Sequence, residues 1–352
     1  MTKHAADYTR TLRLLFWEST ARCNLSCIHC RRLDAEQTAD LTTLQAKEMM
    51  DQLAALGQAQ AFMPLLVFSG GEPLCREDLF ELLEYAAAKG IHRALATNGT
   101  LIDAAAARKI KSAGVQRVSV SLDGADARIH NKLRRQDGSF EAAVCGIRHL
   151  RHNDVPFQIN MTLTRHNAGH LDAVLELACA LGAAAVHVFG LVPVGCGQQL
   201  DCEQMLSAEE YEQLLRHIAR KEETAGIELK VTCVPHYQRV IRQEKPQPRR
   251  MSKGCLAGSG VLFVSHKGEV FPCGYLPVFC GSILHGTLTD IWHSSPDLAR
   301  MQDAGQLKGK CGVCCFKTVC GGCRARAFAA TGDYMEAEPM CIYQPPRKNS
   351  HD

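Results

Sequence analysis

Three cysteines near the start of the chain have the type and spacing that hold a redox-active metal cluster. Cys23, Cys27 and Cys30 form a C-x3-C-x2-C run directly after an apolar segment, Leu12–Trp17. Thiolates are the usual ligands of a [4Fe–4S] cluster. Three closely spaced thiols on one loop can hold three irons and leave the fourth iron open to another ligand. The alternatives are a zinc knuckle or three unrelated thiols.

A second group of cysteines occupies the last third of the chain. Cys255 and Cys273 enclose an apolar hairpin pattern, Val261–Val264 followed by Gly268–Phe271. The cysteines that follow are Cys311, Cys314, Cys320, Cys323 and Cys341. CxxC pairs also bind zinc, but the pairs of a zinc ribbon are typically about 15–20 residues apart. Here five residues separate the two pairs, which favours iron–sulfur ligation.

Composition and charge exclude several classes of protein. The 352 residues include 40 basic and 37 acidic side chains, a net charge of +3, which is too balanced to indicate a nucleic-acid partner. Residues 1–10 are polar and do not resemble a signal peptide, and no apolar run is long enough to span a membrane. We therefore expect the 18 cysteines to belong to a cytoplasmic protein, where thiols more often bind metals than form disulfides.

The positions of apolar residues between about 11 and 190 predict alternating strands and helices. One helix would carry Ala46, Met49, Leu53 and Leu56 on one face and end at Gly57, and a second would end at Gly90. Six repeated βα units predict an α/β fold with a parallel sheet and helices outside it. The predicted strands are Leu12–Trp17, Leu65–Phe68, Ile91–Ala96, Gln116–Ser121, Pro156–Leu163 and Ala185–Phe189.

Polar motifs follow three of these strands at the end where a parallel α/β barrel gathers its reactive groups. Gly70 and Gly71 would let the backbone approach a ligand closely, although an ordinary glycine turn has the same composition. Thr97–Thr100 is expected to face the same cavity. Ser121 and Asp123 offer a hydroxyl and a carboxylate that can hydrogen-bond a ribose.

Together, the C-x3-C-x2-C run with its His29, the glycine turn and the strand-end motif resemble the radical S-adenosylmethionine (SAM) superfamily. The resemblance implies a partial (β/α)6 barrel in which the open iron of a [4Fe–4S] cluster binds SAM. One electron would cleave SAM to a 5′-deoxyadenosyl radical that abstracts hydrogen, so no side chain is assigned a catalytic role. The implied SAM contacts are Gly70, Gly71 and Glu72 at the amino group, Ser121 with Asp123 at the ribose, and Arg134 at the carboxylate.

The second cysteine group resembles the SPASM domain, a C-terminal extension that carries auxiliary clusters. The family run is usually C-x2-C-x5-C-x3-C, whereas the last gap here is one residue shorter. The resemblance implies one or two auxiliary [4Fe–4S] clusters. By position, Cys311, Cys314, Cys320 and Cys341 would hold one of them.

Three ligands of the other auxiliary cluster would be Cys255, Cys273 and Cys323. Its fourth ligand stays open: Cys280 or Cys315 could supply it, or one iron could face substrate or solvent. The cysteines outside the motifs have no assigned role, because a free cysteine behaves as a small buried hydrophobe. These are Cys75, Cys145, Cys179, Cys196, Cys202 and Cys233.

The expected domain order is a short tail, a barrel, a linker and a cysteine-rich domain. The tail covers 1–10, and the radical SAM barrel covers 11–240 with a bridge that contains a helix at Ala208–Glu223 and a strand at Glu228–Cys233. A Pro-, Lys- and Arg-rich linker at 241–254 leads to the SPASM domain at 255–345 and a tail at 346–352.

Over about 11–345 the chain resembles the tetrapyrrole branch of SPASM enzymes, through Trp17–Leu25, Gly260–Val278 and Cys320–Arg326. It is most similar to the enzymes of alternative haem biosynthesis that oxidatively decarboxylate two propionates of iron-coproporphyrin III to vinyl groups, giving haem b. This implies an iron-porphyrin substrate and an electron donor such as ferredoxin or flavodoxin. Candidate cations for the carboxylates are Arg134, Arg135, Arg165, Arg324, Arg326 and His266.

Three rival functions use parts of the same pattern. A 12,18-didecarboxysirohaem deacetylase or a haem d1 enzyme would share the whole scaffold. A peptide-modifying SPASM enzyme would need a peptide-recognition unit, and only about ten residues precede the first strand here. A non-enzymatic iron–sulfur electron carrier would have no use for the SAM-binding motifs.

Overall fold

The computed structural model describes residues 11–32, 39–200, 203–245 and 253–346. Its strands form one ten-stranded sheet in the order β10-β9-β8-β1-β2-β3-β4-β5-β6-β7. The strands are β1 (Leu14–Thr20), β2 (Leu65–Gly70), β3 (His92–Thr97), β4 (Arg117–Ser121), β5 (Phe157–Leu163), β6 (Ala185–Gly190), β7 (Glu228–Thr232), β8 (Val261–Val264), β9 (Glu269–Phe271) and β10 (Gly281–Ser282). Pairing is parallel from β8 through β1 to β7, and β9 and β10 continue the sheet antiparallel.

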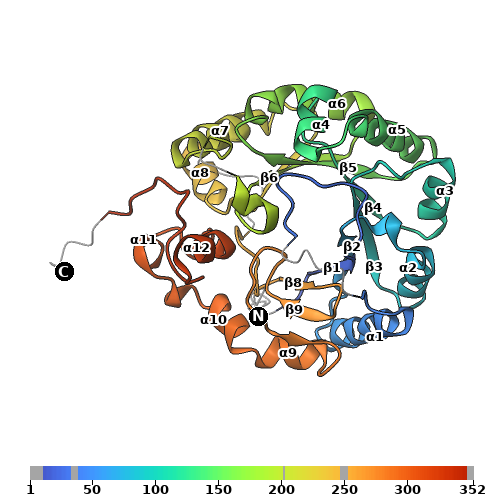
Figure 1. The fold of residues 1–352 in the computed structure, drawn as a ribbon. Helices are drawn as coiled ribbons and strands as arrows, with labels where there is room; N and C mark the ends of the chain where they lie inside the picture. The colour runs from blue at the N-terminus through green and yellow to red at the C-terminus, as the bar shows by residue number, and fades with distance from the viewer. Residues whose placement is uncertain (1–10, 33–38, 201–202, 246–252, 347–352) are drawn as a thin grey trace, which may run out of the picture.

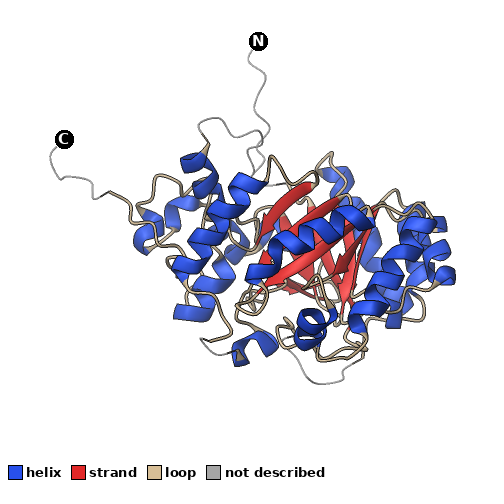
Figure 2. Cartoon of the chain, turned by 90° about the horizontal axis from the view of Figure 1, so that it is seen from above, coloured by secondary structure: helices blue, strands red, loops and turns tan. Residues whose placement is uncertain are grey.

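Helices cover the outside of the curved sheet (Figure 1), and the strands lie in the interior when the molecule is seen from above (Figure 2). The helices of the barrel are α1 (Thr43–Ala59), α2 (Leu79–Ala88), α3 (Ala104–Ser112), α4 (Ala127–Arg134), α5 (Ser139–His152), α6 (Leu171–Leu181), α7 (Ala208–Lys221) and α8 (Tyr237–Glu244). Those of the C-terminal region are α9 (Leu288–Ser294), α10 (Pro296–Gln302), α11 (Gly309–Gly312) and α12 (Arg324–Thr331). Within the described residues, no helix is long and apolar enough to cross a membrane.

The six predicted strands are confirmed as β1 to β6. In β2, the consecutive residues Leu66, Val67 and Phe68 are all buried, as expected for a parallel strand covered by helices. In β1 and β4, buried residues alternate with partly exposed ones. The predicted end of the first helix at Gly57 is wrong, because helix α1 continues to Ala59. The glycine has a packing role within the helix, since a Cβ there would lie 2.7 Å from Met63 Sδ.

The predicted bridge between the two cysteine regions is part of the barrel. Its strand, β7, pairs in parallel with β6 from Ala185 opposite Glu228 to Phe189 opposite Thr232. The predicted linker begins too early, because residues up to Glu244 form helix α8, whose apolar Val240 and Ile241 are buried. Residues 246–252 of that linker, and the two predicted tails at 1–10 and 347–352, lie outside the described residues.

The hairpin of the cysteine-rich region extends the barrel sheet. Strand β8 lies parallel to β1, with Leu14 opposite Val261 and Trp17 opposite Val264. Strand β1 leads into the first cysteine loop, and the neighbouring strands β8 and β9 lead to Cys273. The two cysteine groups, more than two hundred residues apart in sequence, are joined through one strand pair.

A buried ion pair attaches the C-terminal helices to the open side of the barrel, where α12 lies near α8 (Figure 1). Arg326 Nε donates to Glu338 Oε1 at 2.8 Å, and its other nitrogens donate to the carbonyls of Leu191 and Cys233. Both side chains are almost completely buried. Burial alone would raise the pKa of Glu338, but the Arg326 guanidinium lowers it to about 2. The pair therefore stabilises the fold above the ordinary carboxyl pKa, and this stability is lost as the pH falls towards 2.

Replacing Arg326 by Met should lower the free energy of unfolding by about 3–5 kcal/mol, because Glu338 would remain as a buried charge without its partner. Anaerobic chemical denaturation of the cluster-loaded protein measures this difference. The control is Glu81→Gln, which breaks the more exposed pair between Lys47 and Glu81 (2.6 Å) and should cost less than about 1 kcal/mol. Equal costs for the two variants would contradict the role given to Arg326.

Candidate iron–sulfur and SAM site

The loop that carries Cys23, Cys27 and Cys30 begins where β1 ends and is held against helix α4. The Ile28 amide donates to the Leu133 carbonyl at 3.0 Å, and the Cys30 amide donates to the Cys27 carbonyl at 3.3 Å. All three cysteines are partly buried free thiols. Burial raises the pKa of Cys23 to about 11, so this thiol is protonated until a metal displaces the proton.

Gly70 and Gly71 allow the end of β2 to approach this loop closely. A Cβ on Gly71 would lie 2.2 Å from the Arg22 carbonyl oxygen, and one on Gly70 would lie 2.5 Å from that of Thr20. The Gly71 amide donates to the Thr20 carbonyl at 2.8 Å. The glycine turn therefore fixes the residue that precedes Cys23.

Glu72 is completely buried and connects the ends of β2 and β3. Its carboxylate accepts from the Thr97 hydroxyl at 2.7 Å and from the Asn98 amide at 2.8 Å. Asn98 in turn donates to Asn24, inside the cysteine loop, at 2.8 Å. Burial raises the pKa of Glu72, although the hydrogen bonds from Asn98 and Thr97 oppose this. The predicted motif at Thr97–Thr100 thus contacts the cysteine loop through Asn24.

Arg134, which we expect at the SAM carboxylate, pairs with a buried carboxylate beside the cysteine loop. Its Nη2 lies 2.7 Å from Asp123 Oδ2, and its Nη1 donates to Cys27 Sγ at 3.6 Å. Asp123 is fully buried; burial would raise its pKa, but the guanidinium of Arg134 and the ring of His29 lower it. Asp123 therefore links Arg134 of α4 to His29 of the cysteine loop. Ser121 ends β4 as a partly exposed residue.

His29 has a definite contact that the sequence did not indicate. Its Nε2 lies 3.3 Å from Asp123 Oδ2, and burial lowers its pKa to about 4.

A second network joins the loop to the C-terminal hairpin. Glu18 on β1 lies 2.9 Å from His266 Nδ1 and 3.6 Å from Arg31, whose guanidinium stacks 4.5 Å above the Phe263 ring.

Four of the predicted auxiliary ligands line one cavity of the C-terminal region. Cys311, Cys314, Cys320 and Cys341 share it with two side chains that the sequence analysis missed, His236 and Arg239. Arg239 Nη2 donates to Cys341 Sγ at 3.8 Å. His236 is completely buried, neither ring nitrogen has a partner, and burial lowers its pKa to about 4. A neutral imidazole N–H facing this cavity can donate to a cluster sulfur.

The other three predicted ligands lie near the first group. Cys273 and Cys323 pack with Val192, Leu276 and Met335 in a small apolar cluster, and Cys311 of the first group also packs against it. Burial raises the pKa of Cys273 to about 12 and that of Cys323 to about 11. The Cys255 amide donates to the Cys320 carbonyl at 3.1 Å, which places Cys255 between the two groups.

The two candidates for the missing fourth ligand lie elsewhere. Cys280 donates to the Val278 carbonyl at 3.5 Å and packs against the barrel core rather than the small apolar cluster. Cys315 is exposed and lies 3.8 Å from the Tyr343 hydroxyl, next to the other group. In the part of the chain that the structure describes, no three His, Cys, Asp or Glu side chains converge on one metal ion.

Most of the cationic side chains expected to bind substrate carboxylates form hydrogen bonds or ion pairs with other groups of the protein. Arg324 donates to the carbonyls of Tyr334 and Glu336, Arg326 pairs with Glu338, and His266 pairs with Glu18. Arg165 pairs with Glu210 at 2.6 Å. Arg135 is exposed at the end of α4, in the left-handed region with a φ of 53°.

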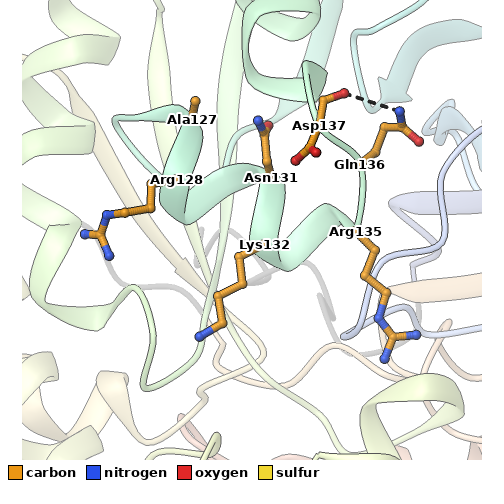
Figure 3. A pocket seen from close by; sticks show the side chains of 7 residues that line it. All are labelled: Ala127, Arg128, Asn131, Lys132, Arg135, Gln136 and Asp137. Atoms are coloured by element: carbon orange, nitrogen blue, oxygen red, sulfur yellow. Dashed lines mark hydrogen bonds between the residues drawn. The ribbon is translucent and has the colours of Figure 1, made fainter.

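An open pocket of about 570 Å³ lies on the exposed face of α4 and the turn after it. Figure 3 shows the side chains of Arg128, Lys132 and Arg135 projecting from this face, with Lys132 between the two arginines and Asn131 and Asp137 above them in this view. The opposite face of α4 carries Arg134, which contacts the cysteine loop. The pocket is therefore separated from that loop by the thickness of a single helix.

Two known families match the chain. Residues 17–178 match the Radical SAM superfamily, and residues 255–324 match SPASM, an iron-sulfur cluster-binding domain. The fold resembles that of Streptococcus suis SuiB bound to the precursor peptide SuiA, with a TM-score of 0.76 and 14% identity over 95% of this chain and 76% of that one. It also resembles anSMEcpe with bound AdoMet, with a TM-score of 0.71 and 19% identity over 94% of each chain. The fold and the thiol groups define a radical SAM enzyme with a SPASM domain.

Sequence relatives narrow this class. The chain is 45% identical to the AdoMet-dependent heme synthase of Methanosarcina barkeri over 97% of this chain and 99% of the relative. It is 40% identical to the AdoMet-dependent heme synthase of Oleidesulfovibrio alaskensis over 100% and 92%. The Fe-coproporphyrin III synthase of Methanosarcina barkeri is 30% identical over 97% and 90%. The chain belongs to the family of these AdoMet-dependent heme synthases.

Replacing Gly71 by Ala should displace Arg22 and with it Cys23, because the new Cβ has no room beside the Arg22 carbonyl. We expect reconstituted protein to lose about four iron atoms per chain, the content of the first cluster, and to cleave SAM at least about tenfold more slowly. Iron analysis and 5′-deoxyadenosine formation measure these effects. Gly169→Ala is the control, since nothing lies within 4 Å of its Cβ position. Equal behaviour of the two variants would contradict this role of Gly71.

Proposed function

We propose that this enzyme oxidatively decarboxylates two propionates of iron-coproporphyrin III to vinyl groups, giving haem b. The observation that carries the proposal is the 45% identity, over nearly the whole of both chains, to a relative named AdoMet-dependent heme synthase. The relative named Fe-coproporphyrin III synthase is less similar, at 30% identity. The higher identity to the heme synthase favours a reaction that consumes iron-coproporphyrin III over one that makes it.

The residues proposed for the first cluster and SAM are those around the cysteine loop. Cys23, Cys27 and Cys30 would hold three irons, and the backbone of the Gly70–Glu72 turn and Ser121 would contact SAM. When bound, the cluster and SAM supply an electron and a carbon radical that abstracts hydrogen from an unactivated C–H bond. Arg134 and Asp123 keep the loop in place, since Arg134 pairs with Asp123 and donates to the thiol of Cys27.

The proposed reaction needs an acceptor for the electron that each propionate loses. Each propionate loses one hydrogen atom from its β-carbon, then CO2 and one electron, and the remaining two carbons form the vinyl group. The hydrogen goes to the SAM-derived radical, and an auxiliary cluster can take the electron. The second cysteine region, proposed as a SPASM domain over about 255–345, would supply this acceptor through Cys255, Cys273 and Cys323 or through Cys311, Cys314, Cys320 and Cys341.

Three rival functions differ in what they would do with SAM and porphyrin. A sirohaem-type deacetylase or haem d1 enzyme would cleave SAM but leave the propionates of iron-coproporphyrin III intact. An electron carrier would not cleave SAM at all. A peptide-modifying enzyme would cleave SAM without acting on porphyrin; it is supported by a relative named PqqA peptide cyclase, which at 29% identity is well below the heme synthases, and by structures below 20% identity, whose likeness reaches no further than the fold.

Anaerobic turnover tests the proposal. With reconstituted protein, dithionite, SAM and iron-coproporphyrin III, we expect stepwise loss of two carboxyl groups by mass spectrometry and two 5′-deoxyadenosine molecules for each haem formed. The matched control is Cys27→Ala, which should form neither product. SAM cleavage with unchanged porphyrin would contradict the proposed substrate, and didecarboxysirohaem would then be the next substrate to test.

We also propose that the basic pocket on α4 binds an acidic electron carrier such as ferredoxin or flavodoxin. Arg128, Lys132 and Arg135 are exposed on it, and the same helix contacts the cysteine loop through Leu133 and Arg134. A helix is about 10–12 Å across, so a carrier seated there would lie close to the first cluster. Opposite charges on the carrier would steer the encounter.

The double variant Arg128→Glu/Lys132→Glu should lower carrier-supported turnover about tenfold at low ionic strength, because it reverses the charge of the pocket. Turnover with dithionite, which needs no docking, should be unchanged. Arg108→Glu/Lys109→Glu, at two exposed positions of α3, is the charge-matched control. An equal loss with dithionite would show that the substitutions damage the enzyme itself and would overturn the docking surface.

A further inference from the structure

The group formed by Cys255, Cys273 and Cys323 lacks a fourth thiol in the motifs, and the structure places one beside it. Cys233 packs, partly buried, against the same small apolar cluster that contains Cys273 and Cys323. It follows β7, far outside the cysteine-rich region in sequence. The part of the barrel that ends β7 thus lies next to the three unpaired ligands.

Backbone contacts hold Cys233 in this position. Arg326, three residues after Cys323, donates from Nη2 to the Cys233 carbonyl at 2.5 Å. The segment after Cys233 also packs closely against the residue before Cys255, because a Cβ on Gly254 would lie 2.8 Å from the Pro235 carbonyl oxygen. Cys233 is therefore tied to the segment that carries Cys323 by a hydrogen bond, and Pro235 is packed against the residue before Cys255.

The backbone of Cys233 is strained, and its place in the chain makes this unusual. Among the described residues, four non-glycine residues have a positive φ: Ala61, Arg135, Asp154 and Cys233. The first three follow the ends of α1, α4 and α5, where a left-handed residue commonly ends a helix. Cys233, with a φ of 59°, follows a strand. A left-handed residue that no helix end explains suggests that its side chain is held in place for a function.

The thiol of Cys233 has the three proposed ligands as its neighbours. The thiols of Cys323, Cys273 and Cys255 lie close enough to add to the increase in its pKa that burial causes. Cys233, Cys255 and Cys273 are only partly buried. The cationic Arg326 lies close enough to lower the pKa of both Cys233 and Cys323.

We infer that Cys233 is the fourth ligand of the auxiliary cluster held by Cys255, Cys273 and Cys323. The inference rests on the proposed auxiliary cluster and adds a residue from outside the cysteine-rich region to it. Cys280 and Cys315, which the sequence offered for this role, face other parts of the molecule. Four thiolates would leave no iron open, so this cluster would transfer electrons and would not bind substrate through an open iron.

The test uses the full chain with Cys23, Cys27 and Cys30 replaced by Ala, so that only auxiliary clusters remain. In this background Cys233→Gly should lower the iron and sulfide content from about eight to about four of each per chain, or convert one cluster to a [3Fe–4S] form with its own EPR signal. Glycine removes the thiol and also relieves the positive φ, so the substitution should not impair folding. Retention of the Cys311 group's cluster confirms that the C-terminal region is folded.

Three further variants decide the interpretation. Cys255→Ala should cause the same loss as Cys233→Gly, while Cys280→Ser and Cys179→Ser should cause none. Full iron content with an unchanged EPR spectrum in Cys233→Gly, against a loss in Cys255→Ala, would overturn the assignment of Cys233. If neither variant loses iron, the auxiliary cluster itself is refuted. Haem synthesis is measured separately in the otherwise unmodified enzyme, so failure of the proposed substrate leaves the ligand test valid.

Discussion

The buried pair of Arg326 and Glu338 joins the two halves of this protein, and the arrangement of the thiols depends on it. Arg326 reaches the carbonyls that follow β6 and β7, while Glu338 accepts from the Cys323 amide at 2.6 Å. A guanidinium has several donors in one plane, so one side chain can satisfy three loops at once. Because a buried charge without its partner is strongly destabilising, these loops have little freedom to separate.

The first cysteine loop is held by a similar device. Asp123, fully buried, binds Arg134, and Arg134 donates to Cys27. Glu72 connects the loop to the end of β3 through Asn98 and Asn24. Residues at the strand ends that a motif comparison assigns to a ligand are here occupied mainly with positioning the loop. Substrate and SAM would therefore meet a site whose walls are already fixed.

The alternation of apolar runs and amphipathic helices was enough to predict the sheet and the first six strands, because a buried parallel strand needs a continuous apolar run. The pairing of β8 with β1 was not predictable, since hydrogen bonds between distant strands leave no local periodicity. Helix α8 was missed for a related reason: its eight residues are mostly polar, and Val240 and Ile241 reveal its buried face only after it packs. His236 and Arg239 carry no motif and became visible only as neighbours of thiols.

The sequence by itself determined the class of chemistry, because cysteine type and spacing limit which metal groups a short loop can bind. It separated the C-x3-C-x2-C loop from the later CxxC pairs, and it identified the four thiols that share one cavity. Tertiary structure alone decided the surroundings of the other three. Cys233 is 22 residues from Cys255 and outside every motif, yet β7 and Arg326 bring it to the group. Ligands on separate elements are brought together by packing, and packing between distant segments is recorded in the fold rather than in local spacing.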